Sequence, residues 1–217
     1  MKGYLLFTIA LLINVSCIRA QDNSTGLSFI SLESGLNLSK FDFTTSEVKS
    51  SFTNGDYSPS HHQAIIFGFE ILDQFNFLLS TSYDKYQIIG KSIDINDTHL
   101  SYDINYVSTS SGLGYNFVVK DNLKLLLNGS LSFNYLLSGF QNLGSSSYDL
   151  EETDFQKKTY GYSIGGGLLY QCTNSIGIVF RYDYKNTLDM NERDLYETYT
   201  IISYMYSMGI RFNLEKQ

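Results

Sequence analysis

Large apolar side chains occupy alternate positions in segment after segment of this 217-residue chain. The last segment is the clearest, because Tyr204, Tyr206, Met208, Ile210 and Phe212 alternate with residues that are mostly small or polar. A period of two is typical of a β-strand with one apolar face and one polar face. The pattern therefore predicts an all-β protein. Its eight predicted strands cover residues 27–38, 63–72, 75–86, 99–118, 122–137, 158–170, 176–186 and 198–214.

The connections between these strands alternate in length. Residues 73–74, 119–121 and 171–175 form tight connections, and strands joined in this way must be antiparallel. The other connections are rich in Ser, Asn, Asp and Glu. This rhythm predicts an up-and-down meander of hairpins with no second domain after the N-terminal segment. The long connections cover residues 39–62, 87–98, 138–157 and 187–197.

The bulky face of the predicted strands is too large for the inside of a small barrel. An eight-stranded barrel has an interior just wide enough for side chains of ordinary size. The opposite face carries Gly, Ser, Asn, Thr and charges of both signs, which can pair in a confined interior. These features predict an eight-stranded antiparallel transmembrane β-barrel with its apolar face toward lipid. The charged residues assigned to the interior are Glu33, Glu70, Asp84, Arg181, Asp183 and Arg211.

Tyrosines gather toward the strand ends that adjoin the long connections. An aromatic girdle at the membrane–water interface has this distribution, because its rings are apolar and its hydroxyls are wet. At the tight-turn ends the expected girdle is thinner, with Phe75, Phe117 and Tyr170. The tyrosines concerned are Tyr83, Tyr135, Tyr160, Tyr162, Tyr182, Tyr184, Tyr204 and Tyr206.

The predicted strand 99–118 changes parity along its length. A bulge near 108–111, or an extension beyond the membrane with two polar faces, would explain the change equally well. The apolar residues Leu100, Tyr102, Ile104 and Tyr106 are even-numbered, whereas Leu113, Tyr115 and Phe117 are odd-numbered.

The first twenty residues have the pattern of a secretory signal peptide, with Lys2, an apolar stretch and small Ala20 before the predicted cleavage site. The predicted division is therefore a signal peptide over residues 1–20 and a barrel domain over residues 21–217. Lipid attachment at Cys17 and an uncleaved anchor are the alternatives.

The composition argues against several other classes of protein. A formal net charge of -7 disfavours nucleic-acid binding, and 2 Cys exclude a disulfide scaffold. No catalytic, cofactor-binding or metal-binding residue is assigned. The alternatives are a lipid-modifying hydrolase or acyltransferase that uses Ser58 or Ser60 with His61 or His62, and a soluble periplasmic lipid-binding β protein.

The other chemistry-bearing residues are assigned to loops. His99 is expected near the loop side, and two acidic runs could bind Ca²⁺ or Mg²⁺ that bridges lipopolysaccharide phosphates. Neither run has the spacing of an EF-hand loop, so solvated loops are the simpler interpretation. The acidic residues are Asp149, Glu151, Glu152 and Asp154, followed by Asp189, Glu192, Asp194 and Glu197.

Over residues 27–214 the chain resembles the small eight-stranded outer-membrane barrels of Gram-negative bacteria, and more narrowly the porin-family barrel proteins of Bacteroidetes. The resemblance rests on the Ala20-Gln21 junction, the segment SIGGGL at 163–168 and the segment YMYSMGIRF at 204–212. It implies export to the outer membrane, insertion by the assembly machinery and no shared catalytic residues. The expected role is that of a monomeric structural or surface-interaction protein that contacts lipid, lipopolysaccharide and an extracellular ligand through its long loops.

Overall fold

The structure is a computed structural model. It describes residues 26–45, 52–53, 57–72, 74–92, 98–152, 157–188 and 197–214. The predicted signal peptide and Cys17 lie outside these residues, so both remain predictions. The described residues contain no helix long and apolar enough to cross a bilayer.

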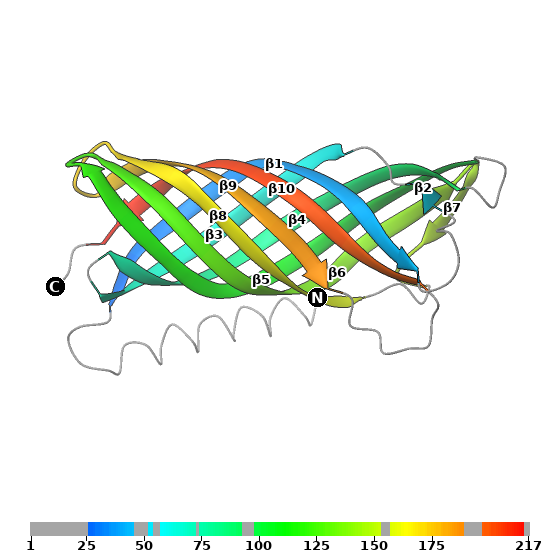
Figure 1. Cartoon of the computed structure of the whole chain (residues 1–217), viewed down its shortest axis with the longest axis horizontal. Helices are drawn as coiled ribbons and strands as arrows, with labels where there is room; N and C mark the ends of the chain where they lie inside the picture. Colours follow the sequence, from blue (N-terminus) through cyan, green and yellow to red (C-terminus); the bar gives the residue numbers. More distant parts are fainter. Residues whose placement is uncertain are drawn as a thin grey trace.

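Eight long strands close into an antiparallel barrel within the described part of the chain (Figure 1). Their order around the ring is β1, β3, β4, β5, β6, β8, β9 and β10, and β1 pairs with β10 to complete it. The predicted fold class is thereby confirmed. The bounds are β1 Leu27–Thr45, β3 Ser58–Leu72, β4 Phe75–Ser92, β5 Thr98–Lys120, β6 Leu123–Leu143, β8 Lys158–Gln171, β9 Ile176–Leu188 and β10 Glu197–Asn213.

Several strands continue well beyond their predicted ends on the side of the long connections. β1 reaches Thr45, β4 reaches Ser92 and β6 reaches Leu143, so the predicted connections 39–62, 87–98 and 138–157 are partly strand. Polar residues can continue a strand because the ladder is made by the backbone. Two short strands, β2 (Phe52–Thr53) and β7 (Ser146–Asp149), pair with β4 and β6 at this end of the barrel.

The bulky face points outward, as predicted. Leu131 and Ile164 expose 70% and 63% of their surface on the outside of the barrel, whereas Asn37, Ser39 and Asp84 are fully buried inside. The orientation of the two faces follows from the interior volume, which favours short polar side chains through most of the lumen.

The parity change in β5 has a different cause from the two predicted ones. Even-numbered residues face the lumen along the whole strand, from Leu100 to Gly114. The β5–β6 register does shift, but between Asn105 and Tyr106, opposite Leu137 of β6, and not near 108–111. The apolar residues Leu100, Ile104 and Tyr106 are simply inside the barrel.

These residues belong to an apolar cluster that fills the loop end of the lumen. Small and charged residues were expected to fill the whole interior, so this part of the prediction is wrong. Tyr86 contributes from the neighbouring strand β4, and Phe41 and Ile201 contribute from β1 and β10 on the far side of the ring. Leu150 folds back from the segment after β7. Smaller apolar clusters lie elsewhere inside the barrel, such as Leu126 with Leu169 and Val179.

Candidate functional site

A network of buried polar groups surrounds Asp84 in the lumen. Its Oδ1 lies 2.6 Å from Nδ1 of His62, and its Oδ2 accepts a hydrogen bond of 2.7 Å from Nζ of Lys185. Ser82 donates to the same Oδ2 at 3.0 Å. Oγ of Ser108 is 2.7 Å from this oxygen and 2.7 Å from Oδ1 of Asn134, so its single proton serves one of the two.

The contact between Asp84 and Lys185 crosses the barrel. Asp84 belongs to β4 and Lys185 to β9, which are four positions apart in the ring of eight. The lysine side chain therefore reaches from one wall to the opposite one. Both side chains are almost completely buried, with exposures of 6% for Lys185 and 0% for Asp84.

A second network forms around Glu33 and Arg181. Nη1 of Arg181 lies 3.6 Å from Glu33, and its Nη2 lies 3.3 Å from Asp183. Ser31 and Ser207 each donate to Glu33 at 2.9 Å. Charged residues of both signs therefore pair in the lumen, as the sequence predicts.

The other two charges assigned to the lumen have different surroundings. The guanidinium of Arg211 lies 3.9 Å from the ring centroid of Phe29, which is a cation–π contact. Glu70 is half-buried near the tight-turn end of β3. A small cavity of about 70 Å³ separates the two networks and is lined largely by serines.

Two members of the lumen networks were missed. His62 was expected in the long connection 39–62. Lys185 shares a face with Arg181 and Asp183 in the predicted strand 176–186, but it was not among the charged residues assigned to the interior. The signal for His62 was available, since it shares its parity with Ala64 and Ile66, which are buried on the same strand. No sequence signal identifies Asp84 as the partner of Lys185.

The serine–histidine pairs of the enzyme alternative are not brought together. His61 is exposed outside the barrel and His62 is buried inside it, as neighbouring strand residues must be. Oγ of Ser60 lies within hydrogen-bond distance of the backbone carbonyls of Asn37 and Lys85, and its single proton serves one of the two. His99 is exposed at the loop end of β5.

No group of three or more His, Cys, Asp or Glu residues in the described part of the chain is arranged to hold a metal ion. In the first acidic run, Asp149 accepts a hydrogen bond of 2.8 Å from the backbone of Glu151, which is a local turn contact. Asp154, Asp189, Glu192 and Asp194 lie outside the described residues.

Part of the predicted tyrosine girdle, on β8, β9 and β10, forms a cluster of aromatic side chains on the outer wall. Tyr182 stacks on Tyr204 with centroids 6.2 Å apart and contacts Tyr206 at 5.0 Å. Tyr184 and Tyr162 extend the cluster along β9 and β8. At the tight-turn end Tyr115, which was not assigned to the girdle, packs between Phe75 and Phe117.

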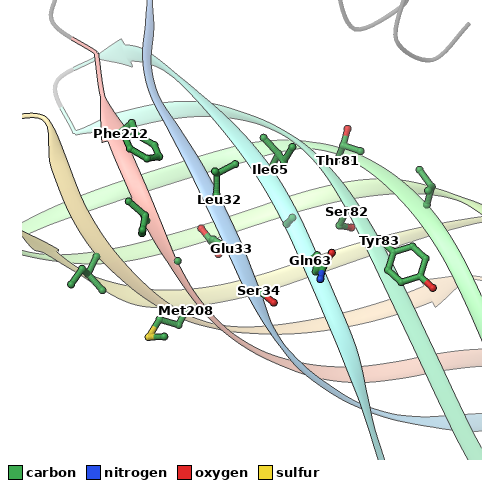
Figure 2. Close-up of a pocket in the computed structure, with 15 residues that line it drawn as sticks. Leu32, Glu33, Ser34, Gln63, Ile65, Thr81, Ser82, Tyr83, Met208 and Phe212 are labelled. Atoms are coloured by element: carbon green, nitrogen blue, oxygen red, sulfur yellow. The ribbon is translucent and has the colours of Figure 1, made fainter. Parts of the chain in front are cut away.

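The outer wall also carries a groove of about 810 Å³ over β10, β1, β3 and β4 (Figure 2). Leu32, Ile65, Ile210 and Phe212 supply apolar lining. Polar side chains also line the groove, among them Ser34, Gln63 and Thr81.

No known family and no curated protein matches the sequence. The fold is similar to that of two solved outer-membrane proteins. Neisserial surface protein A is 16% identical with a TM-score of 0.51, and the match covers 85% of this chain and 97% of that protein. The outer membrane protein OprG from Pseudomonas aeruginosa is 10% identical with a TM-score of 0.55, covering 88% and 98%. These likenesses concern the fold. The apolar outer wall and the aromatic girdle indicate that this fold lies in a membrane. The chain is an integral β-barrel protein of the outer membrane.

Proposed function

We propose that the chain is a non-enzymatic outer-membrane protein with a structural or surface-interaction role, exerted through its long outer loops. The observation that carries the proposal is the filled lumen. Lys185 crosses it to reach Asp84, and the apolar cluster around Tyr86 and Tyr106 fills its loop end. A barrel filled in this way is suited to holding loops at the cell surface and poorly suited to passing solutes.

Conductance in planar lipid bilayers tests this role. The folded protein is expected to give a steady conductance near zero. A variant that combines Asp84→Ala, Lys185→Ala and Tyr86→Ala removes both the contact across the lumen and part of the apolar cluster, so it serves as the positive control. A large steady conductance of the unaltered protein would overturn the proposal.

The absence of enzymatic activity is tested separately with the histidines. His61→Ala removes an exposed imidazole, whereas His62→Gln keeps a hydrogen-bonding side chain beside Asp84. Neither substitution is expected to alter the acyl chains of lipid A or of phospholipids in cells that express the protein. A changed acyl pattern in either variant, with normal protein levels, would favour the lipid-modifying enzyme instead.

The partners that follow from the proposed role are outer-membrane lipid and lipopolysaccharide, the assembly machinery and an extracellular ligand. The tyrosine cluster and the apolar wall support contact with lipid. The aromatic-rich β10, which ends at Asn213, supports recognition by the assembly machinery. Exchanging Phe212 for Ser should lower the amount of folded protein in the outer membrane, and unchanged levels would argue against such recognition.

A further inference from the structure

The outer groove has a polarity gradient along the barrel. β10 supplies only apolar side chains from its outward face, Met208, Ile210 and Phe212, whereas β1, β3 and β4 add polar ones. Figure 2 shows Phe212 and Met208 at one side of the groove and Gln63 and Tyr83 at the other. Phe212 lies at the end of β10 next to the tight turns. The apolar part of the groove is therefore nearer the tight-turn end, and the polar part is nearer the loops.

The polar part of the groove holds donors without protein partners. In the part of the chain that the structure describes, the side chains of Ser34, Gln63 and Thr81 make no hydrogen bond. Ser34 and Gln63 are register partners on neighbouring strands, and both are exposed. An unsatisfied polar group in hydrocarbon costs several kcal/mol, so a partner from outside the chain is favoured.

The depth of these donors identifies that partner. Gln63 lies nine residues from Leu72 along β3, which at ~3.3 Å per residue and a tilt of ~40° places it about 23 Å up the barrel axis. The apolar band of such barrels is about 25 Å tall. In bacterial barrels the short turns are periplasmic, so Gln63 lies near the outer boundary of the hydrocarbon. Lipid acyl chains join their headgroups at this level through carbonyl groups.

We propose that the groove is a binding site for one lipid of the outer leaflet. The amide of Gln63, together with the hydroxyl of its register partner Ser34, donates hydrogen bonds to the carbonyl oxygens that link its acyl chains. The chain itself lies over Leu32 and Ile65 toward Phe212. The polarity of the groove then runs in the same direction as that of an outer-leaflet lipid, and its volume is in the range of ~300–1,000 Å³ usual for ligand sites.

The chain offers a clean spectroscopic test because it contains no Trp. Tyr83, which lines the groove from β4, eight residues from the tight-turn end of that strand, is replaced by Trp as a reporter. Leu131→Trp on β6, across the ring from β1 and also eight residues from its tight-turn end, is the control matched in depth. Each protein is reconstituted in vesicles of brominated ester-linked phosphatidylcholine mixed with unbrominated ether-linked phosphatidylcholine, which lacks the carbonyls.

The expected result is stronger bromine quenching of the Tyr83→Trp reporter than of the Leu131→Trp control, because carbonyl-bearing lipid is enriched in the groove. Adding Gln63→Leu and Ser34→Ala should abolish this excess. These substitutions make a lipid-facing wall more apolar, so the barrel should still fold. Adding Thr109→Val, which removes an exposed hydroxyl on β5 outside the groove lining, should leave the excess intact.

Three outcomes would overturn the proposal. Equal quenching of the two reporters would mean that no lipid is selected. Weaker quenching at Tyr83→Trp would mean that a second copy of the chain covers the groove. If the excess quenching persisted with Gln63→Leu and Ser34→Ala, these two side chains would not be the donors that bind the carbonyl groups.

Discussion

Removing the charge of Lys185 should lower the free energy of unfolding of the barrel strongly. This residue supplies the cation that lies 2.7 Å from fully buried Asp84. Lys185→Met keeps the length of the side chain but leaves the carboxylate with His62 and two serines. Breaking a buried pair in this way costs about 3–5 kcal/mol. Urea unfolding in lipid vesicles, followed by the mobility of unheated protein on gels, should show this loss of stability.

Lys85 provides the control for that experiment. Its pair with Asp103 is equally short at 2.8 Å, but the two side chains are 32% and 36% exposed. Lys85→Met should therefore cost no more than about 1 kcal/mol. In addition, Asp84→Asn should recover part of the stability of Lys185→Met, because no unpaired charge then remains. Equal losses from Lys85→Met and Lys185→Met would contradict the burial argument.

At the scale of the strand, glycines in β8 set how closely the wall packs. A Cβ built on Gly165 would lie 2.0 Å from Oδ1 of Asp183 and 2.5 Å from the backbone oxygen of Tyr182. Gly165→Ala must therefore displace the wall of β9, and overpacking of this kind typically costs ~1–3 kcal/mol. Gly129→Ala on the neighbouring strand should be tolerated, because the nearest atom to its Cβ is 3.8 Å away. The midpoints of urea unfolding of the two variants compare these costs, and similar midpoints would contradict the steric explanation.

The order and facing of the strands could be predicted from the sequence, because both follow from a period of two and from short turns. Strand ends could not, since the backbone ladder continues through Ser, Asn and Lys without regard to polarity. The pairing between Asp84 and Lys185 was also beyond prediction, because it depends on which strands lie opposite each other in the closed ring. His62 was missed because the strand was predicted to begin at residue 63 and β3 begins at Ser58, although its parity with Ala64 and Ile66 indicates an inward position.

For the molecule as a whole, the two ends of the barrel should lie in different compartments. Cys172 is an exposed thiol in the tight connection between β8 and β9, whereas Ser147 is exposed in β7 at the loop end. A membrane-impermeant maleimide should label Ser147→Cys in intact cells when Cys172 is replaced by Ser. Cys172 itself should be labelled only after the outer membrane has been permeabilised. Labelling of Cys172 in intact cells, without labelling of the introduced thiol, would reverse the orientation.

The apolar cluster at the loop end is an exception to the rule that bulky side chains face outward. Volume excludes the whole bulky face from the interior, but it does not exclude a few rings and aliphatic chains near the rim. Tyr86, Ile88 and Ile104 are completely buried there. Their even positions continue the lumen face of β4 and β5 past the polar networks. The alternation of inward and outward residues therefore continues to the loop end, but the inward residues there are apolar instead of polar.

The lumen divides its buried charges between the two halves of the chain. The anions Glu33 and Asp84 are synthesised first, and their cationic partners follow a hundred residues later or more, because the separation is 101 between Asp84 and Lys185 and larger still between Glu33 and Arg181. Hairpins that entered the bilayer one at a time would carry Glu33 and Asp84 into hydrocarbon without Arg181 and Lys185, which is costly. We therefore expect concerted insertion, in which the early and late hairpins neutralise one another before lipid surrounds them. The cations of the late hairpins are Arg181, Lys185 and Arg211.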